Sequence, residues 1–419
     1  MIRAVAASTI GTTVEWYDFF LYNAASALVF PKAFFPGSDP YVATLLSFST
    51  QFAGFAARPL GAAIFGHFGD RVGRKALLVT TMILMGIATT LVGLVPSYAS
   101  IGIWGAVILT VLRSLQGIAV GGEWSGSVLM AGEWADPKRR GFTTSFAQMG
   151  APLGLVLANG SLSLMTWLVG DEALIQWGWR LPFLASIVLV GIGLYVRMGV
   201  LESPVFARLK DLGKVVHAPV LLVIKENWRE IALSTLLRTG QLVPYYVFTT
   251  YILSYGTRVL GLASATMLAC LSLRSLTSIV MIPFAGHMSD LYGRKKIVAI
   301  GLVGIGLFSF VYFQMLATKA VSLVFLAMVI DSVLQDLQYA PQAALIAENF
   351  PASRRYSGSG LGYHLASITA GGPAPIIATS LYQRYQSPYA IAAFVLVSAL
   401  ISLATLLVLK DHSGDLDHT

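Results

Sequence analysis

Charged residues are scarce in this chain. Asp, Glu, Lys and Arg make up 11% of its 419 residues, and 56% are hydrophobic. A soluble globular domain is usually about 25% charged. So little polar surface cannot keep this much apolar mass in water, which excludes an ordinary soluble protein. The composition indicates that the chain has a lipid bilayer as its solvent.

Cysteine is almost absent. The single Cys270 lies in an apolar run, which excludes an internal disulfide and any cysteine-based metal or redox motif. The chain also lacks a nucleophile elbow, a His-Glu-x-x-His zinc motif and a phosphate-binding Gly-x-x-x-x-Gly-Lys-Ser/Thr loop. We therefore predict no catalytic residues, no metal, no cofactor and no direct use of ATP. No cleavable signal pattern precedes the first apolar segment, so that segment is expected to direct membrane targeting.

Twelve segments are apolar and long enough to cross about 30 Å of hydrocarbon as helices. Helices are expected because backbone polar groups find no water inside a bilayer. The segments lie near residues 5–30, 42–66, 76–95, 101–131, 142–169, 180–199, 229–255, 262–288, 297–317, 320–346, 356–382 and 388–409. The fold class predicted from this count is an all-α integral membrane protein with twelve transmembrane helices.

The positive charges alternate between successive connections. Nineteen Lys and Arg residues fall on one side of the predicted membrane and five on the other, while Arg58, Arg113, Arg238 and Arg274 fall inside spans. Cytoplasmic loops carry the excess of Lys and Arg. Both termini are therefore predicted to be cytoplasmic in a plasma membrane (a bacterial inner membrane). The net charge of +8 is assigned to these loops and not to nucleic-acid binding.

A polar connection and a repeat divide the chain into two halves. We predict a six-helix bundle over residues 1–200, a cytoplasmic linker over 201–228, and a second six-helix bundle with a short tail over 229–419. The segment Gly66–Lys75 follows span two and recurs as Gly286–Lys295 after span eight, 220 residues later. Glu133 and Glu348, each ahead of an Arg-Arg pair, recur 215 residues apart. Two matches in one register indicate a parallel duplication, as in transporters that bind substrate at the membrane midplane.

The repeated motifs suggest a gate. Their glycines permit tight turns and close approach of helices, and Asp70 can sit at the N-terminus of a neighbouring helix or pair with a basic residue. The alternative is a basic loop that only obeys the inside rule, and two matching copies favour the gate. The predicted gating residues are Gly66, Asp70, Arg71, Gly73, Arg74, Glu133, Arg139, Arg140, Asp290, Arg294, Glu348 and Arg354.

The double Gly-x-x-x-Asp-x-x-Gly-Arg-Lys motif resembles the loop signature of the major facilitator superfamily, over the whole chain. Finer motifs are similar to those of its metabolite:proton symporter family, and one stretch is most similar to the shikimate transporters of that family. These motifs are Gly11–Phe19, Arg58–Gly61, Arg113–Gly117, Gly121–Trp124 and Trp179–Phe183, and the shikimate-like stretch is Arg355–Tyr363 with Gly371 and Gly372. The resemblance implies two six-helix pseudo-repeats and a substrate such as shikimate, α-ketoglutarate, citrate or proline/betaine.

Ionisable residues inside the first spans suggest proton handling. A charge in a span costs at least about 2.5 kcal/mol. Glu15, Asp18 and Tyr22 share one face of span one. Two acids one turn apart repel, which favours a proton on one of them, whereas the alternative is that one acid only pairs with an arginine. Arg58 in span two can grip a carboxylate substrate or neutralise these acids.

Span four and the C-terminal half add further candidates. Arg113, Gln116 and Glu123 lie within one quadrant of span four, where Arg113 and Glu123 are either alternating partners or a permanent pair. The predicted proton-coupling residues are Glu15, Asp18, Glu123, Asp336 and His364. The predicted substrate-binding residues are Arg58, Arg113, Gln116, Tyr22, Arg238, Gln241 and Tyr245. For His364 the alternative is a structural hydrogen bond.

The spans contain four arginines and several acids, a combination that favours a transporter that binds an anion and moves protons with it. The sequence therefore predicts a monomeric secondary transporter that imports a small organic acid, such as shikimate or a di- or tricarboxylate, together with protons by alternating access. The alternatives are a proton-coupled antiporter that exports its substrate and a symporter of a betaine-like zwitterion. A transporter-shaped sensor and a membrane enzyme are disfavoured.

Overall fold

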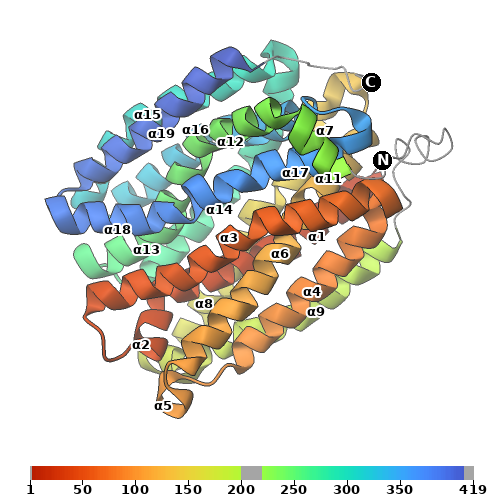
Figure 1. Cartoon of the computed structure of the whole chain (residues 1–419). Coiled ribbons are helices and arrows are strands. Elements are labelled where there is room, and N and C mark those ends of the chain that lie inside the picture. The colour runs from red at the N-terminus through yellow and green to blue at the C-terminus, as the bar shows by residue number, and fades with distance from the viewer. Residues whose placement is uncertain (1, 200–218, 410–419) are drawn as a thin grey trace.

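The computed structural model describes residues 2–199 and 219–409, and within these ranges the chain is a bundle of helices (Figure 1). The N-terminal half contains α1 (Ile2–Leu28), α2 (Phe30–Phe34), α3 (Pro40–Val72), α4 (Arg74–Leu94), α5 (Tyr98–Ile101), α6 (Trp104–Glu133), α7 (Arg140–Gln148), α8 (Gly150–Ala173) and α9 (Arg180–Met198). The C-terminal half contains α12 (Trp228–Tyr246), α13 (Ile252–Ser254), α14 (Ser264–Tyr292), α15 (Arg294–Ala317), α16 (Val321–Ala347), α17 (Arg355–Ala366), α18 (Pro373–Tyr385) and α19 (Pro388–Val408). The short α11 (Pro219–Glu226) precedes α12, and the rest of the predicted linker, 201–218, lies outside the described residues.

The helices follow the twelve predicted spans, with three of the spans assembled from pieces. The span predicted near 229–255 is α12 and α13 joined by a π-helical turn, Val247–Tyr251. The span predicted near 142–169 is α7 followed by α8, and the one near 356–382 is α17 and α18 joined by a π-helical turn, Ser367–Gly371. Among the described residues, eight helices are long and apolar enough by themselves to cross a membrane. The others, α1, α3, α12 and the α17–α18 pair, are more polar or interrupted, and they carry most of the candidate site residues.

Glycines bring α3 and α6 together in the N-terminal half. A Cβ atom on Gly61 would lie 2.0 Å from the carbonyl oxygen of Ile118, and one on Gly121 would lie 2.1 Å from that of Arg58. No side chain fits between these backbones, so the glycines permit a close helix contact of the kind common in membranes. This packing fixes Arg58 and the polar face of α6 next to each other.

The two halves meet along a central interface. In Figure 1, α4 and α9 lie along one edge of the bundle and α15 and α19 along the opposite edge. Between them α17 packs on α3, and α14 packs on α7 and α8. The interface therefore includes α3 and α17, which belong to the more polar or interrupted helices, together with α7, α8 and α14.

Both ends of the described chain lie at one end of the bundle, called here the termini side (Figure 1). The turns after α3 and α14 are formed by Gly73 and Gly293, whose φ angles are 123° and 94°. Residues with side chains rarely adopt these angles. This confirms the tight turns predicted from the repeated motif.

Candidate transport site and gates

Two acids of α1 are buried between helices of the N-terminal half. Glu15 is 5% exposed and Asp18 is fully buried. Glu15 lies in the electrostatic field of Arg58 and Arg197. Asp18 lies near Thr89 and in the field of Arg113. Each acid of the pair therefore has arginine neighbours of its own, although the two are only one helical turn apart.

Arg113 is held by amides and aromatic rings. It donates hydrogen bonds to Asn23 Oδ1 at 2.9 Å and to Gln116 Oε1 at 3.2 Å. Its guanidinium carbon is 4.2 Å from the ring centroid of Phe19 and 4.3 Å from that of Tyr22. The prediction that Arg113 and Glu123 are partners was wrong. They share a face of α6, but ten residues of helix separate them by about 15 Å along its axis.

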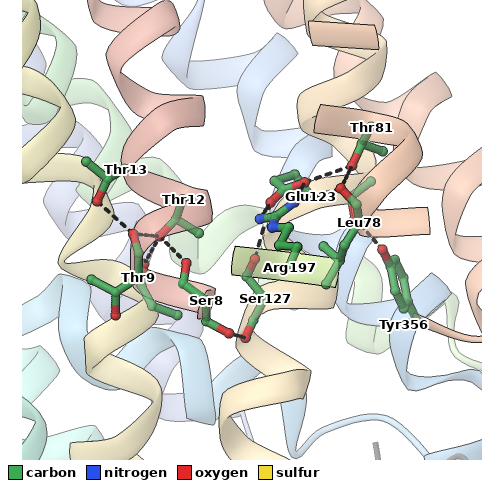
Figure 2. A network of polar contacts seen from close by, with 12 residues as sticks. Ser8, Thr9, Thr12, Thr13, Leu78, Thr81, Glu123, Ser127, Arg197 and Tyr356 are labelled. Carbon is green, nitrogen blue, oxygen red and sulfur yellow. Dashed lines mark hydrogen bonds and ion pairs between the residues drawn. The ribbon is translucent and has the colours of Figure 1, made fainter. Parts of the chain in front are cut away.

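Glu123 pairs instead with Arg197, near the end of α9 (Figure 2). Arg197 Nη1 donates to Glu123 Oε2 at 2.9 Å, and Nη2 contacts Oε1. Thr81 also donates to Oε2, at 2.7 Å. Arg197 is one of the nineteen Lys and Arg residues that the sequence analysis assigned to connections on the side of the termini, but it is only 4% exposed and lies inside the bundle. A position close to a helix end did not reveal that the side chain turns back into the bundle.

Arg58 and Arg238 face the same region from opposite halves. Both arginines act electrostatically on the buried His364 of α17. The guanidinium carbon of Arg58 is 4.2 Å and 4.6 Å from the ring centroids of Phe19 and Phe55, and that of Arg238 is 3.6 Å from the ring centroid of Tyr363. Nε of each arginine lacks a hydrogen-bond partner among the described residues, as do both ring nitrogens of His364. Buried polar atoms are rarely left unpaired, so this cluster marks a candidate ligand site.

Aromatic stacking crosses the interface beside this cluster. The ring centroid of Trp124, on α6, is 3.5 Å from that of Tyr363, on α17. Trp124 donates to Gln148 Oε1 at 2.9 Å, and Gln148 donates to the carbonyl oxygen of Tyr339 at 3.2 Å. The sequence motifs contained Trp124 and Tyr363, but nothing in their spacing showed that they would stack across the two halves.

The other predicted substrate residues divide between two places. Gln241 lies on the same helix as Arg238, and its side-chain oxygen is unpaired among the described residues. The ring centroid of Tyr245 is 6.0 Å from that of Phe20 on α1, which places it at the interface. Tyr22, by contrast, uses its hydroxyl in a hydrogen bond of 2.9 Å to Thr50. Gln116 donates to Thr89 at 2.7 Å, within the N-terminal half.

Asp336 belongs to an ionic cluster inside the C-terminal half. It lies close to Ser278, Arg274 and Asp331. Arg274 is paired with Asp331, to which its Nη2 approaches at 2.8 Å and its Nε at 2.9 Å. Asp336 is therefore grouped with the α14–α16 packing and not with Arg238 or His364.

The two motif aspartates bind helix N-termini of the opposite half on the termini side. Asp70 accepts hydrogen bonds from the backbone N–H of Ser357 at 3.0 Å and from its hydroxyl at 2.7 Å. Asp290 accepts from the backbone N–H groups of Gly141 at 2.9 Å and Phe142 at 2.8 Å. The predicted placement of Asp70 at a neighbouring helix N-terminus is thus what the structure shows, and the two contacts are equivalent across the repeat.

The remaining predicted gating residues lie around these contacts. Arg74 pairs with Glu133, Arg294 with Glu348, and Arg354 with Glu226. A Cβ on Gly66 would lie 2.9 Å from the Cα of Ser357, so this glycine permits α3 and α17 to touch. Arg71 and Arg139 are exposed, and Arg140 is partly buried. Burial of Arg74 and Arg294 at the starts of α4 and α15 was missed, because the sequence placed both in loops.

The halves also touch at the opposite end. Arg258, which follows α13, donates to the carbonyl oxygen of Pro40 at 2.8 Å and contacts the hydroxyl of Thr44. Arg258 is one of the five Lys and Arg residues that the sequence analysis put on the side away from the termini, and no role was predicted for it. Contacts thus join the two halves at both ends, with the arginine and aromatic cluster between them.

Comparison with known proteins agrees with this arrangement. Residues 4–218 match the family model "Sugar (and other) transporter", and residues 257–417 match "Major Facilitator Superfamily". The inner membrane metabolite transport protein YhjE of Escherichia coli is 40% identical, over 97% of this chain and 93% of its own. The shikimate transporter of Escherichia coli is 38% identical (98% and 94%), and the proline/betaine transporter of Salmonella typhimurium is 30% identical (98% and 83%).

Solved structures show the same fold. The proton:xylose symporter XylE, bound to 6-bromo-6-deoxy-D-glucose, superposes with a TM-score of 0.77 at 18% identity, over 99% of this chain and 97% of its own. A partially occluded inward-open form of XylE from Escherichia coli has a TM-score of 0.74 at 17% identity, over 99% of both chains. The twelve helices in two six-helix pseudo-repeats, the family models and the full-length relatives agree, and this chain belongs to the major facilitator superfamily, among its metabolite transporters.

Proposed function

We propose that this protein imports a small organic acid together with protons. The observation that carries the proposal is the cluster between the halves, where Arg58 and Arg238 face His364 with unpaired Nε atoms. Arginine is suited to carboxylates because its planar donors match their geometry. Two arginines from opposite halves allow one carboxylate to draw the halves together, and the nearby hydroxyls of Tyr246 and Tyr363 offer hydrogen bonds to a hydroxylated acid.

We assign proton binding to the acids of α1. Glu15 lies beside Arg58, so the charge of Glu15 competes with a substrate carboxylate for that arginine. A proton on Glu15 would release Arg58 to bind the substrate. Asp18 stands in the same relation to Arg113. Glu123, Asp336 and His364 remain candidates for the same role from the sequence.

We propose that the termini side is cytoplasmic, because the connections there carry the excess of Lys and Arg. Residues 1–200 and 229–419 would then rock against each other, with Asp70 and Asp290 closing the cytoplasmic end. Arg258 would close the other end. The transporter would act as a monomer in the bacterial inner membrane, since each chain contains both halves of the site.

The test is uptake into proteoliposomes of purified protein, with an acidic outside solution. Shikimate, α-ketoglutarate, citrate and betaine are supplied in parallel, with and without a protonophore. We expect one acid to accumulate, and the protonophore to abolish accumulation. Betaine uptake without acid uptake would favour the zwitterion alternative, although two arginines in the site disfavour a ligand with a positive charge. Transport seen only as release from loaded vesicles would favour an exporter.

Variants connect the activity to the site. Arg58→Ala and Arg238→Ala are each expected to lower accumulation of the acid by at least about 30-fold, because removing one partner of a charged hydrogen-bonded pair costs about 2–5 kcal/mol. Arg384→Ala is the control, since Arg384 lies near the end of α18 against Tyr385. Normal uptake by either site variant would remove that arginine from the mechanism.

A further inference from the structure

We infer that protons leave for the termini side through the N-terminal half, by way of Glu123 with Arg197 as its switchable counter-ion, and not through the interface that the substrate crosses. The inference rests on the proposed proton symport and adds the path of the proton. It is carried by the order of buried polar groups between α1, α4, α6 and α9 (Figure 2).

A small hollow lies between the acids of α1 and Glu123. Its walls include Glu15, Asp18, Thr81 and Glu123, and the space is water-sized. Along α6, Glu123 lies about 10 Å nearer the termini side than Gln116, which is level with the Asp18–Thr89 contact. A proton taken up on α1 therefore has an acid of α6 as its next acceptor in the direction of the termini side.

A second hollow lies beyond the Glu123–Arg197 pair. It is lined by Ser8, Lys75, Ser127 and Arg197, among others. Ser127 donates to Glu123 Oε1 at 3.4 Å, and Ser8 donates to the carbonyl oxygen of Ser127 at 3.2 Å. Lys75 reaches the exterior, where its ammonium group donates to the carbonyl oxygen of Met198 at 2.8 Å. The ion pair thus separates a space next to the α1 acids from a hollow next to the surface.

Arg197 is placed to serve two acids in turn. Besides its two contacts with Glu123, it acts electrostatically on Glu15. A Cβ on Gly11 would lie 2.1 Å from Arg197 Nη2, so the bare backbone of α1 makes room for the guanidinium. When Glu15 is charged it attracts Arg197, which leaves Glu123 able to take a proton. When Glu15 is protonated, Arg197 is held by Glu123.

Tyr356 links this path to the interface. It lies on α17, donates to the carbonyl oxygen of Gly122, and acts electrostatically on Arg197. Its chain neighbour Ser357 is the residue that Asp70 holds. Separation of the halves on the termini side would therefore withdraw Tyr356 from the ion pair. The groups that face Glu123 are then Thr81 from α4, Arg197 from α9, Ser127 from its own helix, and the acids of α1.

The path lies away from the substrate cluster. The partners of Glu123 come from α4 and α9, which pack on each other along the outer edge of the N-terminal half (Figure 1). Arg58 and Arg238, by contrast, lie between the halves. Proton release and substrate release would therefore use different exits, although one movement of α17 opens both.

The test compares two modes of transport in the same proteoliposomes, with shikimate as the probe and the pH dye pyranine inside. Exchange is measured with equal shikimate on both sides and no pH gradient, and accumulation is measured with an acidic outside solution. Glu123→Gln alone leaves a buried arginine without its acid and can fail to fold, so the double variant Glu123→Gln/Arg197→Gln is the principal one. Thr90→Val is the control for Thr81→Val, since the hydroxyl of Thr90 donates to the carbonyl oxygen of Gly86 in its own helix and has no acid partner among the described residues.

We expect the double variant to exchange shikimate within about twofold of the wild type, and to lose proton entry and accumulation by at least about tenfold. Thr81→Val should lower accumulation more than Thr90→Val does. Undiminished accumulation by the double variant would overturn the route. Loss of exchange as well would also overturn it, because the pair would then serve substrate binding or the fold. Exchange without proton entry in the wild type would instead refute the proposed symport itself, before any variant is compared.

Discussion

Replacing Asp70 by Asn tests whether the termini side is held closed by charge. In the structure its carboxylate accepts two hydrogen bonds from Ser357, at the N-terminus of α17. A hydrogen bond to a charged group contributes about 1.5–3 kcal/mol, and one to a neutral group about 0.5–1.5 kcal/mol. The charge also gains about 0.3–1 kcal/mol from the helix dipole.

Asp70→Asn is therefore expected to weaken the closed state by about 2 kcal/mol. At 1.4 kcal/mol per factor of ten, the ratio of open to closed molecules should rise roughly 30-fold. The assay is a distance measurement between spin labels at Val72→Cys and Leu291→Cys, in a Cys270→Ala background. Val72 and Leu291 are exposed, at the ends of α3 and α14 in opposite halves. A longer label separation should gain population.

Asp136→Asn is the matched control. Asp136 also accepts a backbone hydrogen bond, at 2.9 Å from Lys138, but within its own exposed loop. It should leave the label distances unchanged. If Asp70→Asn and Asp136→Asn give the same distances as the unsubstituted protein, the contact with α17 does not hold the halves together, and the reasoning from charge and helix N-terminus fails.

Three further predictions concern packing and the opposite gate. Gly121→Ala should lower the free energy of unfolding by at least about 1–3 kcal/mol, because its Cβ would meet α3 backbone, whereas Gly160→Ala, with open space around it, should not; thermal unfolding in detergent compares them. Arg274→Met should destabilise by about 3–5 kcal/mol, and adding Asp331→Asn should recover most of this, as the same unfolding measurement would reveal. Arg258→Ala removes the contact with α3, so a cysteine placed near the start of α3 should react faster with a membrane-impermeant thiol reagent; an unchanged rate would exclude Arg258 as a gate.

The helix-by-helix plan of the protein followed from local properties of the chain. The length of an apolar segment predicts a span because each helix must satisfy its own backbone hydrogen bonds in the bilayer. The Lys and Arg content of each loop also predicts the side of the membrane on which that loop lies. The duplicated motif likewise predicted the tight turns at Gly73 and Gly293, because a turn is made by adjacent residues. The contact of Asp70 with a neighbouring helix N-terminus was one of the two placements predicted for it, and its role as a gate stays a prediction.

Partner choice did not follow from the sequence. Helical periodicity put Arg113 and Glu123 on one face of α6, but it does not state which helix lies opposite at each depth. Arg197 lies at the end of the span predicted near 180–199, and nothing in that position showed that it would pair with Glu123. Its long side chain turns inward because Gly11 leaves room for it.

The sequence by itself determined that the protein has a bilayer as its solvent, and it determined the number of its spans, its duplication and the charges in the middle of its spans. These depend on hydropathy and spacing along one chain. The sequence did not determine the burial of Arg74, Arg197 and Arg294 at helix ends.

Only the tertiary structure decided which charges neutralise each other and which remain unpaired. Glu123 pairs with Arg197 within one half, and Asp70 binds the N-terminus of α17 across the halves. Arg58 and Arg238 face one site with unpaired Nε atoms. Electrostatic energy depends on distances in space of a few ångströms, and those are set by how glycines and aromatic side chains allow separate helices to pack.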